Sequence, residues 1–193
     1  KRQLFYRLRT DATTVLLVIA LMAYGCPVQA IVKAFGFDER TVKSWWQRAG
    51  EHCQAVHEHV VEKSQLDLQQ VQADELKVKM QGKSVWMAMA TMVPTRLWLG
   101  GVISTTRDKV LIEQLVAKVR RIARCRPLLL AVDGLVSYVS AFQKAFRSPV
   151  PRWGRIGRRK LVAWPDIAIV QVVKQRSAAH LDILRRIVQG SEE

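Results

Sequence analysis

Residues 27–50 carry the pattern that most constrains the fold of this chain: two short helices joined by a tight turn. Apolar residues recur at helical spacing, Gly36 interrupts them, and a second helical period begins at Val42. Pro27 suits the start of the first helix, and Asp38 can cap the second through its carboxylate. The sequence therefore predicts a helix-turn-helix over this range.

The outer face of the second helix is expected to be basic and rich in hydroxyl groups. Such side chains contact bases and phosphates when a helix lies in the major groove of DNA. The candidate DNA-binding residues are Arg40, Thr41, Lys43, Ser44, Gln47 and Arg48. A further helix between Asp11 and Gly25 would complete a trihelical DNA-binding module within residues 1–50. A helical hairpin in any small bundle is the alternative interpretation.

The charge of the chain favours a polyanionic partner. Its 31 basic and 16 acidic residues give a net charge of +15, so DNA binding should depend strongly on salt. The most apolar run, residues 15–22, is too short to span a bilayer. The three cysteines are scattered, as expected of free thiols in a reducing compartment. These features predict a cytoplasmic, nucleoid-associated protein without a membrane partner.

Residues 51–70 are polar and favour a helix, which predicts a connecting helix between two domains. Four possible metal ligands lie within it: His52, Cys53, His57 and His59. Their spacing matches no zinc pattern, and no second cluster of ligands lies nearby in the sequence. A metal site in this segment is therefore not favoured.

From residue 71 onward, strand patterns alternate with helical ones. Strands are expected over residues 71–80, 84–93, 96–104, 128–132 and 167–173, and helices over residues 108–126, 136–146 and 178–188. The first three strands form an antiparallel meander, and the helix that follows is a crossover that can lay the fourth strand parallel to the first. The fold class is thus α+β or α/β, with a mixed sheet and flanking helices over residues 71–193.

This topology can bring Asp74 and Asp133 to adjacent strands. Two neighbouring carboxylates repel each other unless a cation lies between them, which makes them candidate ligands for Mg²⁺ or Mn²⁺. Two such ions can activate a water or a 3′-hydroxyl group for attack on a phosphodiester. The alternative is structural: Asp133 caps the helix that follows it, and Asp74 is a surface residue.

Residues 147–160 form a second candidate DNA-binding segment. Six basic residues and no acidic one occur there, together with two prolines and two glycines, which predicts an irregular cationic loop. Its candidate DNA contacts are Arg152, Trp153, Arg155, Arg158, Arg159 and Lys160. A solvated basic loop without a specific role is the alternative.

Three features together resemble the transposases of bacterial insertion sequences, especially those similar to the insertion sequence 1 group. They are QADEL around Asp74, LLLAVDG around Asp133, and the upstream helix-turn-helix. The resemblance implies a ribonuclease-H-like core and a divalent-metal DDE site with Asp74 and Asp133 as its first two catalytic acids. It also implies recognition of the terminal inverted repeats of double-stranded DNA, strand cleavage and transfer, and a dimer or larger assembly.

The third acidic residue of that family, usually a glutamate on a helix after the last strand, has no match here. Asp182 lies in a different setting, AHLDILRRI. The third carboxylate and an upstream zinc-ribbon are therefore expected outside this chain, which starts with Lys1 rather than Met and would then bind DNA without cleaving it. A two-metal site with three protein carboxylates within residues 1–193 would contradict that expectation. A non-enzymatic helix-turn-helix regulator and a structure-specific nuclease are the alternative functions.

Overall fold

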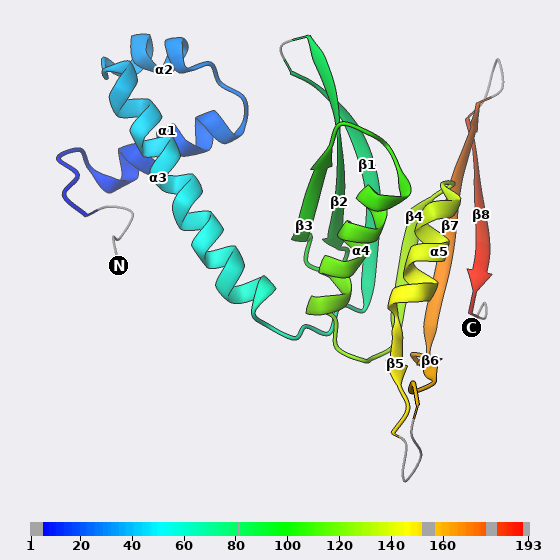
Figure 1. Cartoon of the computed structure of the whole chain (residues 1–193). Helices are drawn as coiled ribbons and strands as arrows, with labels where there is room; N and C mark the ends of the chain where they lie inside the picture. Colours follow the sequence, from blue (N-terminus) through cyan, green and yellow to red (C-terminus); the bar gives the residue numbers. More distant parts are fainter. Residues whose placement is uncertain (1–5, 81, 152–156, 177–180, 191–193) are drawn as a thin grey trace. The chain divides into compact units, whose positions relative to one another are not determined.

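The computed structural model of this chain describes residues 6–80, 82–151, 157–176 and 181–190 (Figure 1). It divides into two compact units, Lys1–Val60 and Val61–Glu193, and each is described by itself. None of the described helices is both long and apolar enough to cross a lipid bilayer.

The first unit contains three helices: α1 (Ala12–Ala23), α2 (Val28–Phe35) and α3 (Glu39–His57). The side chain of Asp11 accepts a hydrogen bond from the backbone N–H of Thr14 and caps α1, and Asp38 caps α3 through the N–H of Arg40. Gly36 ends α2 at a φ of 69°, a left-handed conformation that glycine adopts without steric cost. Both caps and the glycine turn are as the sequence predicts.

A small apolar core holds the three helices together. Val15, Val18, Ile31, Val42 and Trp45 are buried within it. The ring of Trp45 also meets the ring of Phe37 edge to face, with centroids 5.0 Å apart. Each helix of this unit thus contributes apolar side chains to the core, and α1 also leaves Leu16 and Leu17 half exposed.

Near residue 50, where the sequence predicts the end of one helix and the start of another, the structure has one continuous helix, and the first compact unit extends to Val60. Helix α3 runs through Gly50 to His57 and continues as a π-helix, η1 (Glu58–Glu62), so no separate connecting helix begins at residue 51 or reaches residue 70. A glycine inside a helix costs only about 1 kcal/mol relative to alanine. Side-chain hydrogen bonds one turn apart, from Gln47 to Glu51 and from Gln54 to Glu58, lie on either side of Gly50 along the helix.

The second unit is built on a six-stranded mixed sheet with the order β3-β2-β1-β4-β7-β8 (Figure 1). The strands are β1 (Gln70–Met80), β2 (Lys83–Met92), β3 (Leu97–Ser104), β4 (Leu128–Asp133), β7 (Ile167–Arg176) and β8 (Leu181–Gln189). β1, β2 and β3 form an antiparallel meander, whereas β4 lies parallel to both β1 and β7. This mixed architecture is compatible with a ribonuclease-H-like fold.

Helices α4 (Lys109–Ile122) and α5 (Val136–Ala145) pack against each other and against one face of this sheet. The most deeply buried side chains of this core include Leu111, Leu115, Leu130, Tyr138, Phe142 and Ile169. The other face carries exposed polar side chains, among them Gln72, Asp74 and Lys174. The sheet therefore has one helix-covered face and one face that is open to solvent in the described residues.

The structure contradicts the helix expected over residues 178–188. The segment Leu181–Gln189 is strand β8, which pairs antiparallel with β7. Its apolar residues fit a helical spacing, but the edge of β7 would otherwise present a row of unpaired N–H and C=O groups, and pairing satisfies them. The two ends of the predicted cationic loop also pair, as β5 (Arg147–Pro149) and β6 (Leu161–Ala163).

Candidate metal centre

Asp74 and Asp133 lie next to each other because β1 and β4 are parallel neighbours. Ala73 of β1 is in register with Val132 of β4, and each aspartate is the next residue along its strand. Their adjacency is as the strand order predicts, although their chemical role stays a prediction. Asp133 also lies at the carboxyl end of β4, the edge where open sheets commonly bind ligands.

A third carboxylate, that of Glu75, joins them. One oxygen from each of Asp74, Glu75 and Asp133 lies within 4.8 Å of the other two, and we call these three residues the acidic cluster. Sequence reasoning missed Glu75, and placed the third carboxylate outside the chain. Strand alternation would have given the signal, because Glu75 has to face the side opposite to Asp74, where the helices pack and a carboxylate needs partners.

The side chain of Glu75 is fully buried, with 0% of its surface exposed. Its Oε1 accepts a hydrogen bond from Nε of Arg107 at 3.1 Å, whereas its Oε2 is buried and has no hydrogen-bond partner among the described residues. Burial raises the pKa of Glu75, and the Arg107 guanidinium opposes that shift. An orphaned carboxylate oxygen inside a cluster of acids is compatible with a cation binding there.

Arg107, which the sequence analysis also missed, bridges two members of the cluster. In addition to its bond to Glu75, its Nη2 lies 3.2 Å from Oδ2 of Asp133. Its guanidinium lies over the ring of Trp86, 5.1 Å from the centroid. Arg107 thus supplies one positive charge against the three negative charges of the cluster.

Asp133 has a structural role as well. Its Oδ1 accepts a hydrogen bond from the backbone N–H of Leu135 at 2.9 Å, just before α5, while Oδ2 faces Arg107. The side-chain amide of Gln171 donates to the backbone oxygen of Asp133 at 3.4 Å. The helix-capping role expected of Asp133 therefore uses only Oδ1, and Oδ2 belongs to the acidic cluster.

Tyr138 of α5 is a second buried polar group close to the acids. Its side chain is fully buried, and its hydroxyl group has no hydrogen-bond partner in the described residues. Burial raises the pKa of Tyr138, and the negative charges of Glu75 and Asp133 add to the shift. The hydroxyl is therefore protonated, and no acceptor among the described residues lies within hydrogen-bond distance of it.

We expect Tyr138→Phe to raise the free energy of unfolding by about 1 kcal/mol, because the substitution removes a buried hydroxyl without a partner. Urea denaturation of the metal-free protein measures this change. Tyr24→Phe is the matched control, since Tyr24 is 94% exposed and should be unaffected. A clear loss of stability in Tyr138→Phe would mean that the hydroxyl has a partner.

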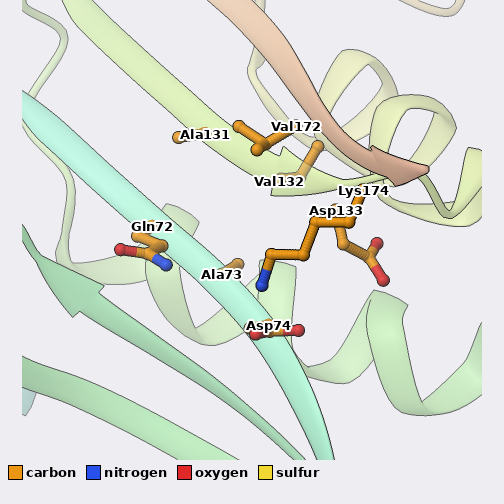
Figure 2. A pocket seen from close by; sticks show the side chains of 8 residues that line it. All are labelled: Gln72, Ala73, Asp74, Ala131, Val132, Asp133, Val172 and Lys174. Atoms are coloured by element: carbon orange, nitrogen blue, oxygen red, sulfur yellow. The ribbon is translucent and has the colours of Figure 1, made fainter. Parts of the chain in front are cut away.

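The open face of the sheet is hollowed next to the cluster (Figure 2). A pocket of about 200 Å³ is lined by Gln72, Ala73, Asp74, Ala131, Val132, Asp133, Val172 and Lys174. Figure 2 shows the side chain of Lys174 directed towards Asp74 and away from the carboxylate of Asp133. A second hollow, of about 520 Å³, shares Gln72 and Asp74 with it and is bordered by Arg96. The two hollows thus meet at Gln72 and Asp74, and each has one cationic side chain in its lining, Lys174 in the first and Arg96 in the second.

The acidic cluster fits a hard divalent cation. Carboxylate oxygens are the ligands that Mg²⁺ and Mn²⁺ prefer, and the unpartnered Oε2 of Glu75 shows that the described partners do not satisfy the cluster. The other candidate metal site finds no support, because no group of three ligating side chains forms around His52, Cys53, His57 and His59 in the described part of the chain. Asp182 is exposed on β8 and does not join the acidic cluster.

The predicted DNA-binding residues of the first unit lie on the amino-terminal half of α3. Arg40, Lys43, Ser44 and Gln47 are exposed, and Thr41 and Arg48 are half-buried. Lys43 pairs with Glu39 on the helix surface, and Arg48 donates a hydrogen bond to the backbone oxygen of Tyr6. These side chains share a surface, but their contact with DNA stays a prediction.

The structure describes three of the six residues of the cationic loop that are predicted to contact DNA. Arg152, Trp153 and Arg155 lie outside the described residues. Arg158, Arg159 and Lys160 are described, and all three are exposed just before β6. Their exposure leaves both interpretations of the loop open.

Comparisons with known proteins leave the family of the chain open. No protein-family model matches it, and no curated protein matches it. The solved structure of an endonuclease V from Bacillus subtilis is similar at 8% sequence identity and a TM-score of 0.27, over 68% of this chain. The match spans only 56% of the endonuclease V chain, less than two thirds of its length. A TM-score this low carries no argument about fold or function, so the proposal below rests on the geometry of the acidic cluster.

Proposed function

We propose that this chain is a DDE-type transposase that cleaves and transfers DNA strands with the help of divalent metal ions. The observation that carries the proposal is the acidic cluster, in which three carboxylates from two adjacent parallel strands converge and one buried oxygen has no partner. A purely structural cluster would be expected to satisfy its buried oxygens. Glu75 lies on β1 and not on a helix after the last strand, so it adds a carboxylate to the cluster without corresponding to the third acid of the DDE family.

In this proposal Asp74 and Asp133 hold the metal, Mg²⁺ or Mn²⁺. A metal bound there supplies Lewis-acid stabilisation to the phosphate oxygens and lowers the pKa of an attacking hydroxyl group. Lys174 and Arg96, which line the two hollows beside Asp74, would contact backbone phosphates and orient the strand on the open face. Glu75 lies on the helix-covered side of the sheet and adds its negative charge to the site.

The first unit would bring this chemistry to a chosen DNA sequence. Its helix α3 presents Arg40, Lys43 and Gln47 on an exposed face, and such side chains read base edges and contact phosphates in the major groove. The proposed targets are the terminal inverted repeats of an insertion sequence, engaged by a dimer or larger assembly. The net charge of +15 favours both steps.

A non-enzymatic DNA-binding regulator is the second candidate, and one observation favours it. Arg107 already pairs with Glu75 and Asp133, as it would in a purely structural ion-pair network. In that case the second unit would serve to sense a ligand or to dimerise. The two candidates differ in whether divalent metal changes what the protein does to DNA.

The test is a cleavage assay with the full chain and a DNA duplex that carries the sequences flanking its reading frame. We expect strand cleavage with Mg²⁺ or Mn²⁺ and none with EDTA or with Ca²⁺ alone. Binding without cleavage in every metal would contradict the transposase and favour the regulator. Cleavage at branched or damaged sites irrespective of sequence would instead indicate a structure-specific nuclease.

A further inference from the structure

Arg107 occupies the position in which a cation between two carboxylates is expected. It lies in the connection between β3 and α4, and its guanidinium reaches Glu75 on one side and Asp133 on the other, at 3.1 and 3.2 Å. A planar guanidinium suits this task because its N–H groups point in fixed directions towards two acceptors. Arg107 thus links β1 to β4 through two ion pairs.

The connection around Arg107 is fixed by its neighbours. The N–H of Thr106 donates to Oγ of Ser104, and the hydroxyl of Thr106 donates to Asp108 at 2.7 Å. The second oxygen of Asp108 accepts from the N–H of Leu111 and caps α4. Hydrogen bonds on both sides therefore anchor the backbone of Arg107, and the Trp86 ring supports its side chain.

The two ion pairs of Arg107 differ in burial. The side chain of Glu75 is fully buried, whereas those of Asp133 and Arg107 are 30% and 38% exposed. Breaking the pair with Glu75 would leave a buried charge without compensation, which is costly. The pair with Asp133 faces solvent, so water or another cation can replace Arg107 there at a much smaller cost.

We propose that Arg107 is the built-in counter-ion of the acidic cluster: it holds Glu75 and Asp133 together in the metal-free protein and yields Asp133 to a divalent cation when one binds. Arg107 keeps its bond to Glu75 throughout and acts as a positioning residue. This inference rests on the proposed function, because it assigns the cluster a metal. It adds that the metal has an internal competitor, so half-occupancy of the site requires a higher metal concentration than it would with the carboxylates alone.

The inference predicts the metal affinity of an Arg107→Gln variant. Glutamine removes the competing charge. We therefore expect the Kd of the variant for Mn²⁺ to be about ten- to hundredfold lower than that of the unmodified chain, the range over which groups around metal ligands commonly change metal affinity. Without metal, Arg107→Gln should unfold at a lower temperature than the unmodified chain, and saturating Mn²⁺ should reduce the difference. Isothermal titration calorimetry and thermal unfolding of the full chain measure both effects.

Two further variants make the comparison decisive. Arg121→Gln is the matched control: Arg121 belongs to an exposed ion pair with Glu62 outside the cluster, and its removal should leave the Mn²⁺ affinity unchanged. Arg107→Lys keeps the charge but cannot bridge two acceptors in the same way, so its Kd should lie between those of the unmodified chain and Arg107→Gln. If Arg107→Gln does not fold, Arg107→Lys decides by the same comparison.

The outcomes separate this inference from the function on which it rests. If the unmodified chain binds Mn²⁺ and the Arg107 variants bind it equally or more weakly, Arg107 is not a competitor and the inference is overturned, while the metal-dependent function stands. If neither the unmodified chain nor any Arg107 variant binds Mn²⁺, both fail. The inference is supported if the Arg107 variants bind Mn²⁺ more tightly than the unmodified chain and Arg121→Gln does not.

Discussion

Asp133→Asn is expected to reduce metal-dependent DNA cleavage by at least about 100-fold, the upper end of what substitutions around metal ligands commonly cost. The substitution removes the charge that would hold the metal while preserving the shape of the side chain. Its Oδ1 can still accept the hydrogen bond from the N–H of Leu135, so α5 should begin at the same place. The assay is the rate of strand cleavage in saturating Mg²⁺.

Asp74→Asn should have a similar effect, because Asp74 belongs to the same cluster from the neighbouring strand. The matched control is Asp182→Asn, which removes an exposed carboxylate from β8 without touching the cluster. Thermal unfolding of each variant excludes loss of folding as the cause. Full cleavage by Asp133→Asn would refute the assignment of the acidic cluster as the active site.

Trp45→Ala should unfold the first unit and leave the second intact. Trp45 is 4% exposed, and truncating a buried tryptophan typically costs about 3–5 kcal/mol. A unit of this size buries a small core and has little stability to lose, so a cost of this magnitude approaches its whole stability. Hydrogen exchange should then show loss of protection in α1, α2 and α3, while β1, β4 and α4 keep theirs.

The adjacent tryptophan supplies the control for this experiment. Trp46 is 42% exposed on α3, so Trp46→Ala should leave the hydrogen exchange of the first unit almost unchanged. If α3 reads DNA, Trp45→Ala should also abolish sequence-specific binding while the Mn²⁺ affinity of the acidic cluster stays the same. Unchanged protection in Trp45→Ala would show that its core contacts are not what holds the three helices together.

Local chemistry explains which elements could be predicted from the sequence. Asp11 and Asp38 cap helices, and Gly36 ends one, through interactions within a few residues, so the pattern of residue types is sufficient. The strand order follows from the run of three strands, a crossover helix and a buried strand. That order placed Asp74 beside Asp133 although 59 residues separate them in sequence (133 minus 74).

The errors arose where long-range contacts outweigh local preference. Leu181–Gln189 has apolar residues at helical spacing, yet it pairs with β7 because an open sheet edge gains more from a partner strand. Helix α3 is a different case: it passes Gly50 because the residues after it favour a helix, a local signal that is already visible in the sequence. Only the pairing of Leu181–Gln189 cannot be read from a short window of sequence.

The sequence by itself determined the helices of the first unit, the antiparallel meander with β4 parallel to β1, and the presence of two aspartates on neighbouring strands. Only the tertiary structure decided what surrounds those aspartates. Glu75, Arg107 and Tyr138 come from a strand, a connection and a helix, and they meet because packing buries Glu75 between the sheet and its helices. Burial makes an unpaired charge costly, so the partners of a buried carboxylate are set by which elements pack around it, and sequence spacing does not record that packing.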